Sequence, residues 1–422
     1  MTGLTRWALW FGGLAFFTCY LGQTVLGVLQ PTIAADLDLS TSEAQWVVNS
    51  FFLTLALFAA PGGRLGDYYG HREVLLVALG VFALGSASAV VSQGFVWLVV
   101  SIGVAGIGAS TLYPSSAAMI ANRVPEEHRG DALGKYSAIG VGLVAMGWLR
   151  VDNRPVGEPE PFDTGGLVVL MAGLTALLVA LMQALSWGWD SGATLTLFGV
   201  GLSVLAAFAQ LELRKPHPLL DVGLLRRRVV RGIVLAMFTA QVVVTGYIVY
   251  VATYFQHVLG YGPLLAAVAI VPSMLAEPLF NILAGRATDR IGARTPAIVG
   301  YLATALALGW VALFADDGSY ALLLPGLLLL STSIAPMFTS LLTGLANAVA
   351  AEERGDANAL VLTVRWIGAA AGTMVLGVVI YGDGSGAATA GASSYATAFA
   401  ILAATALAGA AACAALLRER PT

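Results

Sequence analysis

The chain has 422 residues, of which 58% are hydrophobic and 11% are charged, and its formal net charge at pH 7 is -3. Soluble domains carry about 45–50% apolar and about 25% charged residues, so this composition excludes an ordinary soluble protein. The mean hydropathy of +0.83 predicts that most of the chain lies in a lipid bilayer. The two cysteines, Cys19 and Cys413, lie in apolar runs far apart, which predicts neither a disulfide framework nor a metal-ligand cluster.

Twelve apolar segments are long enough to cross a bilayer, which takes about 20 residues in a helix. In chain order they are 7–29, 44–62, 73–92, 95–121, 164–186, 191–211, 232–256, 262–284, 295–314, 320–349, 357–380 and 394–417. The predicted fold class is therefore an all-α integral membrane protein with about 12 transmembrane helices.

Lysine and arginine residues occur on alternate connections between these segments. The connections 31–43, 92–95, 187–190, 257–262, 315–319 and 381–394 contain neither residue. The other side holds Arg6, Arg64, Arg72, Arg123, Arg129, Lys135, Arg214, Lys215, Arg226, Arg227, Arg228, Arg231, Arg286, Arg290, Arg294, Arg354, Arg418 and Arg420. The positive-inside rule places this second set and both termini in the cytoplasm, which predicts a multi-pass protein of the cell membrane.

One apolar segment, 134–149, does not fit this alternation. Lys135 before it and the start of the 164–186 helix after it both belong on the cytoplasmic side. A full crossing at 134–149 would invert every later helix. We therefore expect a re-entrant or interfacial segment there. The alternative is a tilted short span whose partner segment is not evident from the sequence.

Two short motifs occur twice in the same order. G-R-L-G-D-Y-Y-G-H-R, Gly63 to Arg72, returns as G-R-A-T-D-R-I-G-A-R, Gly285 to Arg294. E-E-H-R-G-D-A-L, Glu126 to Leu133, returns as E-E-R-G-D-A-N-A-L, Glu352 to Leu360. Two related helix groups facing each other across a central site form a transporter architecture.

The first motif has a composition that suits a tight cytoplasmic loop between two helices. Glycines permit a sharp turn and close backbone approach. An aspartate can accept hydrogen bonds from the free N–H groups at a helix start, where the helix dipole favours an anion. We predict that the motif acts as a conformational latch between the two groups, through Gly63, Asp67, Gly70, Arg72, Asp289 and Arg294. The simpler alternative is a solvated turn whose charges only set topology.

At these residues the chain resembles the major facilitator superfamily, specifically its fourteen-helix drug:proton antiporter branch. Gly63–Arg72 is similar to that family's loop between helices two and three, and Gln45–Thr54 to its second helix. The C-terminal half resembles the branch at Tyr254–Pro263 and Arg365–Gly372. Ser186–Trp189 and His217–Asp221 are similar to its linker hairpin and the exit from it. The resemblance implies an N-terminal bundle at 1–149, a linker at 150–231 with a helical hairpin at 164–211, and a C-terminal bundle at 232–422.

The chain also departs from that branch. The aspartate usual in helix one corresponds to Gly22, and the arginine and glutamine usual in helix four correspond to Ile102 and Ala105. The Gly-Pro motif of helix five is absent after Ala138–Gly147, and helix six is missing. The N-terminal bundle would then have four full helices where the family has six, which weakens the expectation of ordinary transport.

Two ionisable residues lie well inside predicted spans, Glu277 and Arg365. Such residues are costly in a bilayer and suggest function by default. Each is placed about eight residues from its cytoplasmic helix end, or about 12 Å deep at 1.5 Å per residue. The functional hypothesis is that Glu277 titrates during transport opposite Arg365 or a cationic substrate. The alternative is a buried ion pair that joins two helices.

Other polar and aromatic residues on predicted helices are candidates to line a cavity. Each alone is more often a helix–helix hydrogen bond or an interface anchor than a ligand contact. They are Gln23, Thr24, Asn49, Tyr113, Gln241, Tyr247, Tyr250, Asn347 and Trp366.

Several functions are excluded or disfavoured. No Gly-x-x-x-x-Gly-Lys-[Ser/Thr] loop is present, and the four histidines show no metal-ligand spacing. We expect no catalytic residues, no metal, no cofactor and no nucleic-acid partner. The predicted function is proton-coupled, alternating-access export of a small amphipathic organic compound by a monomer in the lipid bilayer. The alternative is a transporter-derived membrane-embedded binding protein or enzyme that uses the cavity between the bundles.

Overall fold

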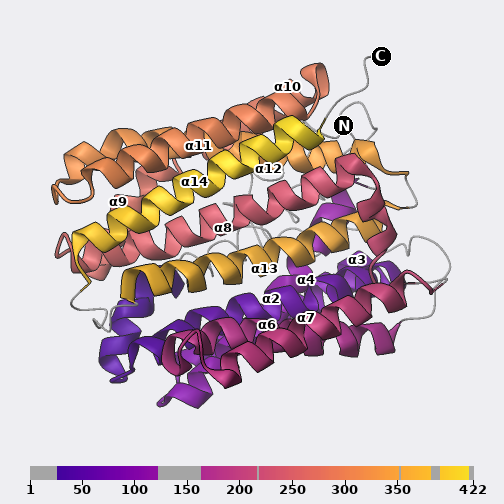
Figure 1. Cartoon of the computed structure of the whole chain (residues 1–422), viewed down its shortest axis with the longest axis horizontal. Helices are drawn as coiled ribbons and strands as arrows, with labels where there is room; N and C mark the ends of the chain where they lie inside the picture. The colour runs from indigo at the N-terminus through magenta and orange to yellow at the C-terminus, as the bar shows by residue number, and fades with distance from the viewer. Residues whose placement is uncertain (1–25, 122–162, 216–217, 351–352, 382–389, 418–422) are drawn as a thin grey trace.

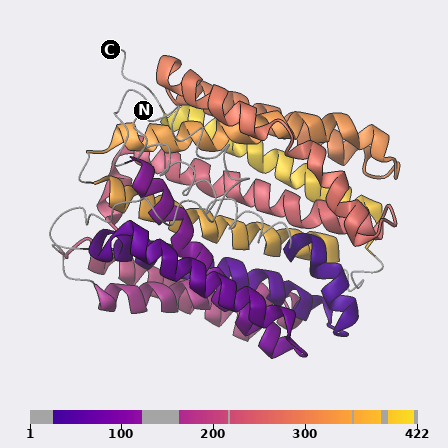
Figure 2. The same cartoon turned by 180° about the vertical axis from the view of Figure 1, so that it is seen from behind.

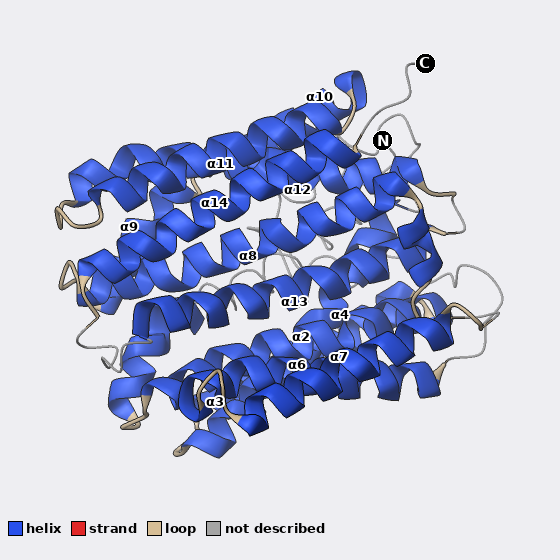
Figure 3. Cartoon of the chain, viewed as in Figure 1, coloured by secondary structure: helices blue, strands red, loops and turns tan. Residues whose placement is uncertain are grey.

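The computed structural model describes residues 26–121, 163–215, 218–350, 353–381 and 390–417. All regular structure in these ranges is helical (Figure 3). Ten helices among the described residues are long and apolar enough to cross a membrane. They run side by side along the longest axis of the molecule (Figure 1). This confirms the all-α membrane fold expected from the sequence.

The N-terminal helices pack through small residues. Residues 26–36 are helical, and the elements that follow are α2 (Thr41–Tyr69), α3 (His71–Val90), α4 (Phe95–Ala121), α6 (Thr164–Trp187) and α7 (Gly192–Glu212). The helix α4 packs against both α2 and α3. A Cβ atom at Gly106 would lie 2.8 Å from the Phe51 carbonyl oxygen of α2, and one at Gly85 would lie 2.4 Å from the Ala105 nitrogen of α4. Glycine therefore permits the close helix contacts that stabilise packing in a bilayer.

The C-terminal helices form a second packed group. Its elements are η2 (Val222–Arg226), α8 (Arg228–His257), α9 (Pro263–Ile270), η3 (Val271–Ser273), α10 (Glu277–Ile291), α11 (Arg294–Phe314), α12 (Tyr320–Ala348), α13 (Arg354–Tyr381) and α14 (Ala392–Leu416). The helix α8 lies at the centre, in contact with α12, α13 and α14, while α11 packs on α12 and α14. Figure 2 shows the same arrangement from behind.

The two groups of helices meet mainly where α2 packs against α13. A second contact joins the helix at 26–36 to α8, where Nε2 of Gln256 donates to the carbonyl oxygen of Val28 at 2.9 Å. The hairpin of α6 and α7 lies beside this junction, because α6 contacts both α2 and α13. In the described part of the molecule, the interface between the two groups is therefore formed by packed faces of α2, α6 and α13.

The duplicated motif differs from the expected loop. The helix α2 continues to Tyr69, so Gly63 lies inside a helix, and the turn before α3 is the single residue Gly70, with φ 93°. In the second copy α10 continues to Ile291, and Gly292 follows with φ 78°. Each glycine N–H donates to the carbonyl oxygen four residues earlier, at 3.0 Å in both copies. The two turns are thus equivalent in structure as well as in sequence. Both need a residue with positive φ, which glycine adopts readily, and this explains why glycine occurs at both positions.

Several expected features lie outside the described residues. They are the segment 134–149, most of the 7–29 span, and the first copy of the second motif, Glu126 to Leu133. The spans predicted from 44–62 onward each correspond to an observed helix, with one exception. The segment 262–284 was predicted as one helix and is two, because the chain leaves the α-helical path between Ile270 and Glu277.

Candidate functional site

The break in the predicted 262–284 helix lies within the membrane-spanning segment. The helix α9 ends at Ile270, a short 3-10 turn contains Pro272, and α10 begins at Glu277. Proline lacks an N–H and clashes with the carbonyl of the preceding helical turn, which explains the interruption. Pro278 at the second position of α10 is compatible with a helix start. The break places Glu277 in the first turn of a half-helix, where the helix dipole favours a carboxylate.

Glu277 is half-buried and lies near a polar contact between α10 and α12. Asn281, one turn further along α10, is buried, and its Oδ1 accepts a hydrogen bond from Oγ1 of Thr339 at 2.8 Å. Glu277 lies 14 residues from the end of α10, at about 21 Å along the helix axis. This is deeper than the 12 Å expected, because α10 extends beyond the predicted boundary.

Arg365 lies on α13 and is buried, with 5% of its surface exposed. Its Nε donates to Oε1 of Gln241 on α8 at 2.7 Å. The guanidinium carbon lies 4.4 Å from the centre of the Phe338 ring and 5.5 Å from that of Trp366. Stacking of this kind is favourable for a desolvated guanidinium. The predicted residues Arg365, Gln241 and Trp366 thus form one cluster between α8, α12 and α13.

The structure does not pair Glu277 with Arg365. No ion pair between them occurs among the described residues. Instead Arg365 lies against Phe338 of α12, while Asn281, one turn after Glu277, accepts a hydrogen bond from Thr339 of α12. The alternative interpretation, a buried ion pair of these two residues, is therefore absent from this conformation.

A second polar cluster joins the two groups of helices. Oγ1 of Thr373 on α13 donates to Oδ1 of Asn49 on α2 at 2.7 Å. The hydroxyl of Tyr250 on α8 donates to the carbonyl oxygen of the same threonine at 2.5 Å. Nε2 of Gln45, one turn before Asn49, is buried without a hydrogen-bond partner, close to Gly377. We call these five residues the α2–α13 seam.

The sequence predicted Asn49 and Tyr250 but missed Gln45, Thr373 and Phe338. Gln45 and Asn49 are spaced four residues apart on α2, which places two amides on one helix face. That spacing could have indicated a polar interface. Thr373 lies in an apolar run of α13 and Phe338 in one of α12, and neither gives a comparable signal.

The remaining cavity candidates are dispersed. The hydroxyl of Tyr247 and Nε1 of Trp366 are both buried without a hydrogen-bond partner. Asn347 is exposed near the end of α12. Gln23 and Thr24 lie outside the described residues, as does the side chain of Tyr113. The structure therefore does not bring the whole predicted set together in one cavity.

Of the predicted latch residues, Arg294 has a described contact that lies within the C-terminal group. Its NH2 donates to the carbonyl oxygen of Ala414 at the end of α14, at 2.8 Å. Asp289 is exposed in the last turn of α10. The side chains of Asp67 and Arg72 lie outside the described residues.

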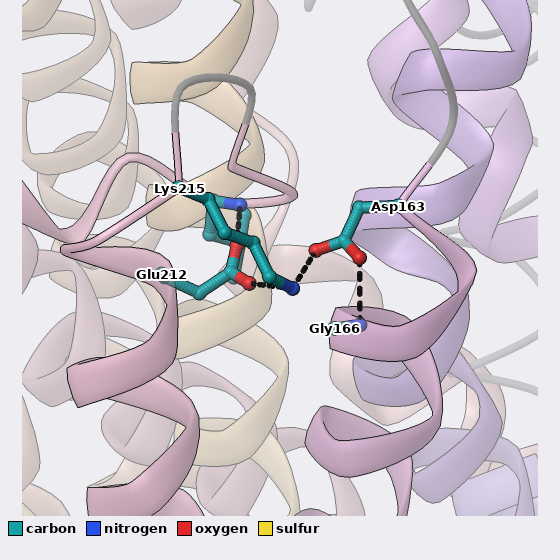
Figure 4. A network of polar contacts seen from close by, with 5 residues as sticks. Asp163, Gly166, Glu212 and Lys215 are labelled. Carbon is teal, nitrogen blue, oxygen red and sulfur yellow. Dashed lines mark hydrogen bonds and ion pairs between the residues drawn. The ribbon is translucent and has the colours of Figure 1, made fainter.

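An ionic network closes the base of the α6–α7 hairpin (Figure 4). Nζ of Lys215 lies 2.5 Å from Oδ2 of Asp163 and 3.1 Å from Oε1 of Glu212. Asp163 also caps α6 by accepting from the Gly166 N–H at 2.9 Å. Partial burial by itself would raise the pKa of Asp163, but the hydrogen bonds from Lys215 and Gly166 outweigh it and hold that pKa below its ordinary value.

The linker that follows is tied to the C-terminal helices by arginines. NH1 and NH2 of Arg227 donate to the two carboxylate oxygens of Glu353 at 2.7 and 2.6 Å. These hydrogen bonds lower the pKa of Glu353. The positive-inside rule predicts that all these arginines lie on one side of the membrane. Consistent with that, Arg228 bonds Ala415 and Arg354 bonds Ala346, so the ends of α8, α12, α13 and α14 lie together.

No cluster of three or more His, Cys, Asp or Glu side chains able to hold a metal occurs in the described part of the chain. An open groove of about 430 Å³ lies on the hairpin, lined by Met171, Ala172, Thr175, Ala176, Val179 and Leu197. None of the predicted site residues lines it. Arg365, Gln241 and Asn49 instead lie buried between helices.

Membrane-length helices, a structurally repeated turn and polar clusters between two helix groups define an α-helical membrane transport protein. The family model of the Major Facilitator Superfamily matches residues 12–373, and again residues 279–422. Because the match covers most of the chain, the chain belongs to the Major Facilitator Superfamily. It is a transporter and not an enzyme.

Individual relatives show the same relationship over most of their length. Multidrug resistance protein Stp of Mycobacterium tuberculosis is 28% identical over 400 residues, covering 87% of this chain and 74% of the relative. The tetracenomycin C resistance and export protein of Streptomyces glaucescens is 27% identical, covering 85% and 73%. Cephamycin export protein CmcT of Amycolatopsis lactamdurans is 29% identical, covering 91% and 87%.

Proposed function

We propose that this transporter exports a small amphipathic organic compound by alternating access, coupled to the entry of protons. The observation that carries the proposal is the position of Glu277. A carboxylate inside a membrane-spanning segment is costly and suggests function. It lies at the start of a half-helix, and broken helices of this kind form the substrate and ion sites of many transporters. The relatives described as drug-resistance or export proteins support export of an organic compound.

In this proposal Glu277 takes up and releases the coupled proton, and Arg365 sets the charge balance of the cavity. Phe338, half-buried beside Arg365, offers aromatic surface to an amphipathic compound. The α2–α13 seam and the contact between the 26–36 helix and α8 must open and close in each cycle, because these join the two groups. The duplicated turns at Gly70 and Gly292, with Asp67, Arg72, Asp289 and Arg294, act as latches at the cation-rich end.

The orientation and domain division complete the proposal. The cation-rich helix ends face the cytoplasm, with both termini. The N-terminal bundle is 1–149, the linker with its hairpin is 150–231, and the C-terminal bundle is 232–422. The protein acts as a monomer.

The test is transport in proteoliposomes with an imposed pH gradient. A fluorescent amphipathic dye should accumulate against its gradient when protons can flow, and Glu277→Gln should abolish this accumulation. Gradient-free exchange of the dye should persist, because substrate binding does not need the proton. Glu73→Gln, which removes an exposed carboxylate in the first turn of α3, is the matched control and should transport normally. Coupling that survives in Glu277→Gln would refute the titration role.

A second candidate is a membrane-embedded binding protein that does not transport. It is favoured by Ile102 and Ala105, which are apolar and buried where the family usually has an arginine and a glutamine. This candidate predicts saturable dye binding to the purified protein with no flux under any gradient. Dye flux would eliminate it.

A further inference from the structure

The helix α8 is buried along nearly its whole length except at one short face. Its exposed residues are Arg228, Arg231 and Leu235, and every later residue of α8 is buried or half-buried. Their spacing of three and four residues places them on a single helix face. Leu235 exposes 46% of its surface one turn deeper in the membrane than Arg231. This face therefore presents cations at the helix end and an apolar side chain beneath them.

The linker before α8 adds a further cation at the same place. Leu219, Leu220 and Leu224 are buried in the core, which anchors η2 against the helices. Arg226, the last residue of η2, is exposed. Within the described part of the chain, neither Arg226 nor Arg231 has a hydrogen-bond or ion-pair partner. With respect to the described residues, two guanidinium groups thus remain available beside the start of α8.

The neighbouring arginines are engaged differently. Arg227 is neutralised by its two hydrogen bonds to Glu353. NH2 of Arg228 donates to the carbonyl oxygen of Ala415 at 2.7 Å. The other N–H donors of Arg228 do not take part in this hydrogen bond. Ala411 and Ala415 of α14 are exposed small residues beside this face. Small apolar side chains of α14 therefore lie beside the cations.

We propose that Arg226, Arg228 and Arg231 bind the phosphodiester headgroup of an anionic phospholipid, whose acyl chain lies along Leu235 and the exposed alanines of α14. Guanidinium groups match phosphate oxygens in geometry and charge. Basic clusters next to a membrane-spanning helix attract anionic lipids. The exposed leucine below the cations favours a lipid over a free anion. This site does not depend on the direction or coupling of transport.

The test measures lipid affinity of the purified full chain in detergent by native mass spectrometry. Phosphatidylglycerol should bind more tightly than phosphatidylcholine. The double variant Arg226→Gln/Arg231→Gln should lose about 30-fold in affinity for phosphatidylglycerol. Leu235→Gln should weaken long-chain phosphatidylglycerol more than a short-chain analogue. The matched pair is Arg231→Gln against Arg290→Gln, since each removes one exposed arginine from a helix end.

The controls separate this site from general surface charge. If Arg290→Gln weakens binding as much as Arg231→Gln, or the double variant binds normally, the proposal is wrong. Inorganic phosphate should fail to displace the lipid at millimolar concentration, and displacement would indicate a free-anion site instead. All variants should unfold at the parent temperature in lipid-free detergent, because the substituted side chains are exposed.

Discussion

Nε of Arg365 donates to Oε1 of Gln241 at 2.7 Å, so a charge on α13 is oriented by an amide on α8. Nε2 of that amide donates to Oγ1 of Thr245 at 2.8 Å, which fixes the orientation of the amide. The Phe338 ring supports the other side of the guanidinium. The position of this buried charge therefore depends on Gln241, whose loss would affect both stability and any site built around Arg365.

Gln241→Leu should destabilise the protein. The substitution removes the acceptor of a buried charged donor, which costs about 1–3 kcal/mol of unfolding free energy. The measurement is the unfolding transition in detergent. Gln241→Glu keeps an acceptor at the same place and should retain stability much better. Equal unfolding of Gln241→Leu and the parent would show that the hydrogen bond contributes nothing.

Lys215→Met should destabilise the base of the α6–α7 hairpin. The lysine bridges Asp163 and the buried Glu212, so its loss leaves two adjacent carboxylates without a cation. Breaking a buried pair costs about 3–5 kcal/mol, and the partial exposure of Lys215 reduces this to about 1–3 kcal/mol. The measurement is thermal unfolding at pH 7.

The pH dependence of stability should weaken in the same variant. In the parent the pKa of Asp163 is lowered, so its contribution is present above the ordinary value of 3.8 and is lost as pH falls through the lower folded pKa. In Lys215→Met the hydrogen bond from Lys215, the largest cause that lowers the pKa of Asp163, is lost, so that pKa lies closer to its ordinary value. The loss of stability as pH falls should then be smaller than in the parent. A parent-like profile in the variant would contradict the assigned role of Lys215.

The sequence predicted the helices well because apolar length and the positions of cations determine membrane spans. It failed at residues 271–276, because Pro272 within this largely apolar run does not tell whether the helix bends or ends. In a membrane, proline within an apolar run fits both a kinked helix and a break. In the structure the helix breaks, and α9 contacts α8 while η3 contacts α12.

The candidate site was predicted in part for a similar reason. Glu277 and Arg365 are conspicuous as charges within apolar segments, and the sequence placed them at equal depth. Hydropathy does not reveal which side chains they contact: Arg365 lies against Phe338 and bonds Gln241. Thr373 was missed because a threonine within a helix usually bonds its own backbone, whereas this one also reaches Asn49 on α2.

Alanine at either duplicated turn should be destabilising. Gly70 and Gly292 have φ of 93° and 78°, which side chains with a Cβ rarely adopt. Each substitution should cost about 1–3 kcal/mol of unfolding free energy. Gly309→Ala is the matched control, because Gly309 lies within α11 with open space around it. The control should be neutral or slightly stabilising, since alanine favours a helix. Similar unfolding temperatures for all three variants would argue against strain at the turns.

Cross-linking the α2–α13 seam should arrest transport. Asn49 and Thr373 lie in direct contact, with 2.7 Å between Oδ1 and Oγ1. In a background with Cys19→Ser and Cys413→Ala, the pair Asn49→Cys/Thr373→Cys should form a disulfide on oxidation. Alternating access requires this contact to open, so dye flux should stop on oxidation and return with a reducing agent. Each single cysteine variant controls for oxidation itself and should transport throughout. Unchanged flux through a fully cross-linked protein would mean that α2 and α13 stay together during the cycle, and the proposed opening between the two groups would then be wrong.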